Sequence, residues 1–73
     1  KIDEYIMLRL RLSSGVDEVE IRDKFGVDLL EKYPKILNFV SLDYMKKSGT
    51  KYSFTSKGFF VSNYILTEIL SFE

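Results

Sequence analysis

The sequence has no cysteine, no histidine and no tryptophan, and only one proline among its 73 residues. The lack of cysteine excludes a disulfide framework and fits a reducing, cytoplasmic compartment. Without histidine or cysteine, any metal ligands would have to be carboxylates. No imidazole is present to activate a serine or threonine, so a serine–histidine type of active site is excluded.

An excess of charge of one sign is also lacking. The 11 basic and 11 acidic residues cancel, so no overall field attracts nucleic acid or anionic lipid. No apolar run approaches the ~20 residues that a membrane-spanning helix needs. The chain shows no signal-peptide pattern either. We therefore expect no membrane partner.

Apolar side chains are plentiful: 45% of the residues are hydrophobic, with six Phe and five Tyr. A chain of this length forms one domain, which we expect to span residues 1–73. The sequence opens at Lys1 without Met and runs directly into an apolar segment. This start is typical of a piece excised from a longer protein.

The segment Asp3–Leu12 carries two conflicting patterns. Apolar residues at every second position suggest a strand, whereas the Leu, Met and Arg content favours a helix. Asp3 and Glu4 suit the positive end of a helix dipole, so we expect a deeply packed helix. Ser13, Ser14 and Gly15 would end it, and Gly15–Val16 could form a short extended piece.

Three short helical segments should follow. Asp17 is a typical N-cap for a helix over Glu18–Phe25, which Gly26 would end. Asp28 would cap one turn over Leu29–Lys32, and Pro34 suits the first position of a helix that runs to Leu42. The spacing resembles a helix-turn-helix. The expected inward side chains are Val19 or Ile21, Phe25, Leu29, Leu30, Tyr33, Ile36, Leu37, Val40 and Phe39.

The C-terminal third alternates with period two and then changes to helical periodicity. Asp43–Lys47 and Lys51–Phe54 flank a glycine-containing turn and predict a β-hairpin. Thr55 or Ser56 should cap a last helix, whose inward face repeats every four residues at Val61, Ile65 and Ile69. We therefore predict a mostly helical α+β, winged-helix-like fold: three N-terminal helices (the third broken before Pro34), a β-hairpin wing and a C-terminal helix.

Candidate chemistry is sparse. The only acidic cluster, at Asp17, Glu18, Glu20 and Asp23, lacks the spacing of a calcium loop and is better explained as a solvated helix face. No serine–lysine pair is arranged for nucleophilic catalysis. We expect no catalytic, cofactor-binding or metal-binding residue in this chain.

Nucleic-acid binding is the main alternative, because winged helices often bind DNA. The helix after Pro34 offers only Lys35, Asn38 and Ser41 as contact groups. No arginine in this region is placed to read guanine. Lysines are more frequent around the hairpin, where they can contact phosphates or block strand pairing at the edge: Lys46, Lys47, Lys51 and Lys57. Nucleic acid is thus the less favoured partner.

Protein docking is the other possibility. Arg9 and Arg11 diverge by about 200° on a helix, so each can pair locally, with Glu4 or Asp17, or dock against another domain. The last helix has apolar character almost all round, from Phe59, Phe60, Tyr64 and Phe72. Such a helix is typically buried on both sides, either within its own domain or against a further domain. The candidate interdomain docking residues are Arg9, Arg11, Phe60 and Tyr64.

Two blocks of sequence resemble a known family. Glu4–Val16 (EYIMLRLRLSSGV) resembles the opening of the C-terminal domain of oxygen-independent coproporphyrinogen III oxidase-like radical SAM proteins. Phe54–Gly58 (FTSKG), with the following Phe59–Ile65, resembles the closing strand and helix of that domain. The resemblance covers essentially the whole chain. The chain departs from the family pattern at Arg9, where the family often has glycine. It also has no glycine directly before Leu42.

The resemblance implies an accessory role. Such proteins hold an iron–sulfur cluster through a Cys-x-x-x-Cys-x-x-Cys motif in an N-terminal barrel and use S-adenosylmethionine. Some oxidatively decarboxylate coproporphyrinogen III, while relatives resemble haem chaperones. None of the cluster ligands falls in this chain. The implied role is a C-terminal domain that packs beside the radical SAM barrel and has no enzymatic activity alone.

Overall fold

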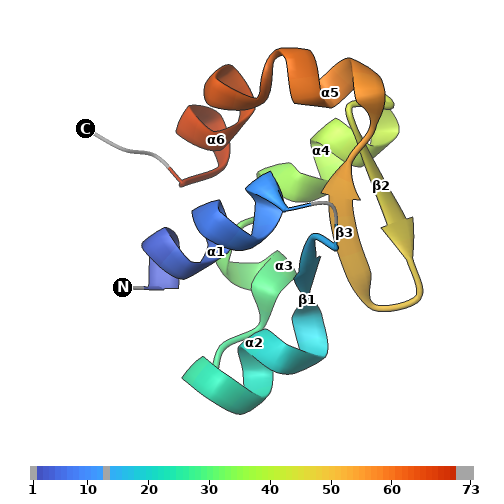
Figure 1. Cartoon of the computed structure of the whole chain (residues 1–73). Coiled ribbons are helices and arrows are strands. Elements are labelled where there is room, and N and C mark those ends of the chain that lie inside the picture. The colour runs from blue at the N-terminus through green and yellow to red at the C-terminus, as the bar shows by residue number, and fades with distance from the viewer. Residues whose placement is uncertain (1, 13, 71–73) are drawn as a thin grey trace.

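The computed structural model describes residues 2–12 and 14–70, so the prediction for Phe72 lies outside it (Figure 1). The described residues form six helices and a three-stranded sheet. In chain order these are α1 (Ile2–Arg11), β1 (Val16–Asp17), α2 (Glu18–Phe25), α3 (Leu29–Lys32), α4 (Lys35–Ser41), β2 (Met45–Ser48), β3 (Lys51–Phe54), α5 (Ser56–Phe60) and α6 (Ser62–Leu70). This is the predicted winged-helix-like α+β fold.

The sheet is antiparallel in the order β1-β3-β2. Ser48 pairs with Lys51, so the hairpin turn consists of Gly49 and Thr50. Gly49 has a φ of 65°, as the first central position of a tight hairpin turn requires. The predicted extended piece after Gly15 is β1, where Val16 pairs with Tyr52 of β3.

Burial decides between the two patterns of the first segment. Ile6 and Leu10, four residues apart, are buried, whereas Leu8 and Leu12 are exposed. This spacing fits one turn of a helix and confirms α1 over a strand. The expectation of a deeply packed helix was wrong, because α1 buries only one face.

The predicted caps are present in the middle of the chain. The Asp17 carboxylate accepts hydrogen bonds from the backbone N–H of Val19 (2.9 Å) and from the hydroxyl of Thr50 (2.8 Å). The bond from Thr50, followed by that from Val19, lowers the pKa of Asp17. The start of α2 is thereby tied to the hairpin turn.

The cap predicted at Asp28 and the helix predicted after Pro34 are also present. The Asp28 carboxylate accepts from the N–H groups of Leu30 and Glu31, at 3.0 Å each. Pro34 takes helical dihedrals just before α4, which begins at Lys35, one residue later than predicted. In α4 the prediction for Leu37 was wrong: this side chain is exposed, while Ile36 and Phe39 are buried. In α2 the buried residue is Ile21.

The first hairpin strand is shorter than predicted. β2 begins at Met45, because Asp43 has a φ of 70° and turns the chain before the sheet. The backbone N–H of Tyr44 instead donates to the carbonyl of Phe39 at 2.9 Å, which closes the end of α4. Asp43 and Tyr44 therefore belong to the connection.

The last helix is broken in two, which the four-residue repeat did not predict. The Thr55 hydroxyl caps α5 by accepting from the N–H of Gly58 at 3.1 Å. The chain then turns at Val61, whose side chain is 41% exposed, so its predicted inward position was wrong. The turn lets α6 place a separate apolar face in the core, formed by Ile65, Leu66, Ile69 and Leu70.

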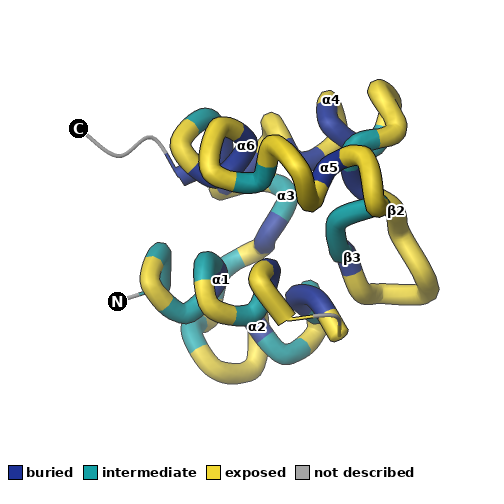
Figure 2. The backbone as a smooth tube through the Cα atoms, turned by 45° about the horizontal axis from the view of Figure 1, so that its top comes forward, coloured by how far each residue is buried: buried dark blue, intermediate teal, exposed yellow. Residues whose placement is uncertain are grey.

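The core lies where α1, α4 and α6 meet the sheet (Figure 2). Its fully buried side chains come from most of the elements and include Ile6, Leu10, Val16, Ile21, Leu29, Ile36, Met45, Tyr52 and Ile65. The residues of the hairpin turn and most residues of α5 are exposed. In the described part of the chain, the helices are all too short, or too polar, to span a bilayer.

Candidate interdomain docking surface

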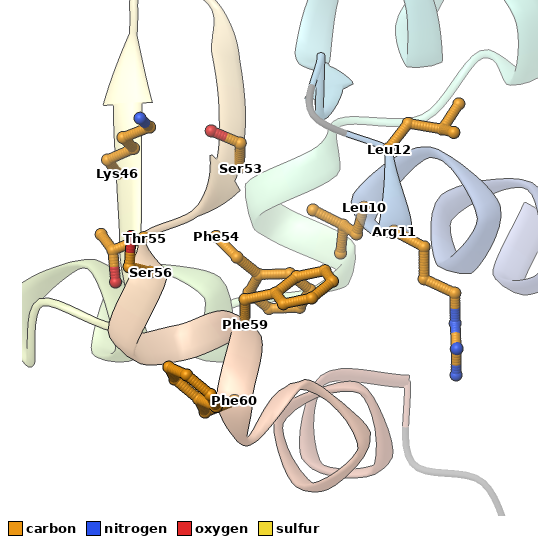
Figure 3. Close-up of a pocket in the computed structure, with 10 residues that line it drawn as sticks. All are labelled: Leu10, Arg11, Leu12, Lys46, Ser53, Phe54, Thr55, Ser56, Phe59 and Phe60. Carbon is orange, nitrogen blue, oxygen red and sulfur yellow. The ribbon is translucent and has the colours of Figure 1, made fainter.

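A groove lies between the end of α1, the open end of the β2–β3 hairpin and α5 (Figure 3). Its volume is about 560 Å³. It is lined by residues from these three parts of the fold: Leu10, Arg11, Leu12, Lys46, Ser53, Phe54, Thr55, Ser56, Phe59 and Phe60. We call it the α1–α5 groove.

The apolar side chains of the groove form a floor and a rim. Phe54 of β3 and Phe59 of α5 line the groove together with Leu10 of α1 (Figure 3). Leu10 is fully buried, whereas Phe59 is 60% exposed. Phe60 points away from this cluster and is 90% exposed.

The charged side chains of the groove are both cations. Arg11 extends from the α1 wall, and Lys46 stands on the hairpin wall (Figure 3). The Arg11 guanidinium donates to the Oδ1 of Asn63 at 3.1 Å and so joins α1 to α6. Among the described residues that line the groove there is no carboxylate. The groove is thus apolar with a positive edge.

Two of the four predicted docking residues, Arg11 and Phe60, meet at this groove. Tyr64 lies on α6, one residue after the Arg11 partner Asn63, and is 63% exposed. Arg9 lies elsewhere: it borders a second, shallower depression beside α2. The structure therefore separates the two arginines, as their helical spacing predicted.

Local partners of the arginines differ from those considered in the sequence. Arg9 donates to the hydroxyl of Ser14 at 3.4 Å, and Arg11 donates to Asn63, not to Glu4 or Asp17. The depression beside Arg9 has mixed charge and is lined by Asp17, Val19, Glu20, Asp23, Lys24 and Lys51. Three members of the predicted acidic cluster, Asp17, Glu20 and Asp23, thus line this depression.

Four apolar groove residues were not among the predicted docking residues: Leu10, Leu12, Phe54 and Phe59. Phe54 was placed in a strand and Phe59 in a helix, and only the fold brings them opposite Leu10. An available signal was the i, i+4 spacing of Leu8 and Leu12, which leaves an apolar stripe opposite the Ile6–Leu10 stripe of α1.

Residues for chemistry are not assembled. In residues 2–12 and 14–70, no group of three acidic, histidine or cysteine side chains could hold a metal ion. The Tyr33 hydroxyl donates to the carboxylate of Asp3, which is half-buried. Burial, with a smaller effect of Asp3, raises the pKa of Tyr33 well above its usual range. A tyrosine that keeps its proton is a structural group here.

The surface proposed for DNA contact has two parts. In α4, Lys35 forms a salt bridge with Glu68 of α6 at 3.2 Å, and Leu37 is exposed beside Asn38. On the wing, Lys46, Lys47 and Lys51 are exposed. The exposed positions of α4 thus carry one cation, already paired with Glu68, while three lysines are exposed on the hairpin.

A family model described as the HemN C-terminal domain matches residues 1–61. The chain belongs to this family. It is the family that the two sequence blocks resemble, the C-terminal domain of HemN-like radical SAM proteins. The comparisons with curated proteins and with solved structures found no match.

The match places the groove inside the HemN C-terminal domain. All ten groove residues lie between positions 10 and 60, within the matched range. The range ends at Val61, where the chain turns from α5 into α6. The groove is therefore built from the part of the chain that defines membership of the family, whereas Asn63 and Tyr64 are outside it.

Proposed function

We propose that this HemN C-terminal domain is a non-catalytic docking domain that packs beside the N-terminal radical SAM barrel of a longer, cytoplasmic HemN-like protein. The parent would be an oxygen-independent coproporphyrinogen III oxidase or a haem chaperone. The iron–sulfur cluster and S-adenosylmethionine would then be held by the barrel, and haem metabolism would be the setting of the whole protein.

The observation that carries this proposal is the α1–α5 groove with its exposed aromatics. Phe59 and Phe60 expose most of their surface beside Leu12, which is costly unless a partner covers it. Tyr64 extends the same apolar character onto α6. Of the four predicted docking residues, Arg11, Phe60 and Tyr64 would contact the barrel, whereas Arg9 would lie at its margin.

Association with the barrel tests the proposal. The 73-residue domain and the separately produced N-terminal barrel of its parent should bind each other in isothermal titration calorimetry. The double variant Phe60→Ser and Tyr64→Ser should weaken binding at least tenfold, because exposed aromatic anchors dominate interface energies. Val19→Ser, at an exposed apolar position within α2, is the matched control.

Two results would refute the docking role. One is the absence of binding between the folded domain and the folded barrel. The other is turnover of coproporphyrinogen by the purified domain without the barrel, since the proposal gives this chain no catalytic residue.

DNA binding by the winged-helix fold is the alternative function. The exposed wing lysines are the feature that favours it. Salt-dependent binding of duplex DNA would support this alternative over docking. The double variant Lys46→Ala and Lys47→Ala should then weaken that binding.

A further inference from the structure

We propose that the α1–α5 groove binds an extended acidic segment of the barrel, in which an aromatic side chain is flanked by carboxylates. This inference rests on the proposed docking function and names the chemistry of the segment that the groove would hold. The aromatic side chain would enter beside Phe54 and Phe59, and the carboxylates would meet Arg11 and Lys46.

Charge is the first reason for an acidic partner. The chain as a whole is neutral, yet the groove presents two cations and, within its described lining, no carboxylate. Beside α2, by contrast, Asp17, Glu20 and Asp23 stand among three cations, Arg9, Lys24 and Lys51, which balance them. The two unbalanced cations make the groove locally positive, which favours carboxylates and disfavours a basic segment.

The position of the two cations is the second reason. Arg11 and Lys46 stand on opposite walls, with the phenylalanines between them (Figure 3). A segment that crosses the groove with its aromatic side chain on Phe59 would place acidic neighbours near both walls. The arginine is suited to this because a guanidinium has five N–H donors. It can keep its bond to Asn63 and still bind a carboxylate.

The floor of the groove is the third reason. Phe54 and Phe59 offer ring surfaces on which a further aromatic ring can stack or pack edge to face. The volume of about 560 Å³ falls within the ~300–1,000 Å³ typical of pockets that enclose a ligand group. Hydroxyls of Ser53 and Ser56 lie on the lining and can bond to a peptide backbone.

Titration with short peptides tests the inference directly. The probe is acetyl-Gly-Glu-Asp-Phe-Glu-Asp-Gly-amide, added to the ¹⁵N-labelled 73-residue chain and followed by NMR. The amide signals of Leu12, Ser53 and Phe59 should shift. Two matched peptides should bind at least fivefold more weakly: one with lysine at the four acidic positions, and one with serine in place of phenylalanine.

Variants of the domain complete the test. The double variant Arg11→Glu and Lys46→Glu should weaken binding of the acidic peptide at least tenfold. Lys47→Glu makes the same charge change as Lys46→Glu alone, one position along β2 and on the opposite face, and should leave binding within twofold. Circular dichroism melts verify that each variant is folded, and higher salt should weaken the peptide complex.

The possible outcomes separate the inference from the docking function. The inference is overturned if the three peptides bind alike, if the shifts map to α2, or if the domain binds the barrel equally well after Arg11→Glu and Lys46→Glu. Peptide binding at the groove by a domain that does not bind the barrel would instead refute the docking function.

Discussion

At the scale of single residues, the contact between Tyr33 and Asp3 joins the start of α1 to the end of α3. The tyrosine side chain is buried, and its hydroxyl donates to the carboxylate across 30 positions of the sequence. Burial and the nearby carboxylate both disfavour the phenolate, so the pKa of Tyr33 is raised from 10.0. Burial raises the pKa of Tyr52 in the same way.

This contact predicts a loss of stability in alkali. The unfolded chain loses the tyrosine proton near pH 10, whereas the folded domain retains it, so stability should fall as the pH rises above about 10. Tyr33→Phe should lower stability at pH 7 by about 1 kcal/mol, through loss of the hydrogen bond. It should also lose less stability between pH 9 and pH 11. Urea unfolding at several pH values measures both, and an equal alkaline loss in the two proteins would contradict the prediction.

At the scale of elements, α5 lies directly on the backbone of the connection that leads into β2. A Cβ added at Gly58 would stand 1.8 Å from the carbonyl oxygen of Tyr44. That carbonyl also accepts the N–H of Thr55 at 3.1 Å. The glycine therefore determines how closely the helix that carries Phe59 and Phe60 approaches the hairpin.

Gly58→Ala should destabilise the domain by about 3 kcal/mol, because neither backbone can move away cheaply. In a solvent-exposed helix, replacing glycine by alanine would stabilise the helix, since alanine is the better helix former. Gly26→Ala is the control: its φ of 71° is unfavourable for alanine, but the space around it is empty, so the cost should be about 1 kcal/mol. Denaturant unfolding compares the two, and a stabilised Gly58→Ala variant would contradict the contact.

At the scale of the whole molecule, the aromatic residues divide between the core and the exposed surface. Tyr52 and Tyr33 are buried, whereas Phe60 and Tyr64 expose most of their surface. A domain of this size has a thin core, so exposed apolar area that no partner covers contributes little to its own stability. Docking and folding should therefore depend on different side chains.

Phe60→Ser should change the free energy of unfolding by no more than about 0.5 kcal/mol, because the side chain contacts little of the domain. Ile65→Ala removes a fully buried side chain from α6 and should cost about 3 kcal/mol. Thermal unfolding of both variants is the measurement. A large loss of stability in Phe60→Ser would show that this residue belongs to the core.

The candidate site was predictable only in part. Arg11 and Phe60 were recognised because a cation and an aromatic stand out on helices with apolar character on several sides. Phe54 and Phe59 were not, since their meeting with Leu10 depends on how three separate elements pack. Leu37 and Val61 were misplaced because helical periodicity gives the spacing of a face but not the direction in which a short helix points.

The starts of three helices and the hairpin turn could be predicted from the sequence alone. Asp17, Asp28 and Thr55 cap helices and Gly49 permits a tight turn, because these effects act over a few neighbouring positions. The turn at Val61 and the α1–α5 groove were decided by tertiary structure. α5 must lie against Tyr44 while α6 must bury Ile65, and no single straight helix can satisfy both contacts.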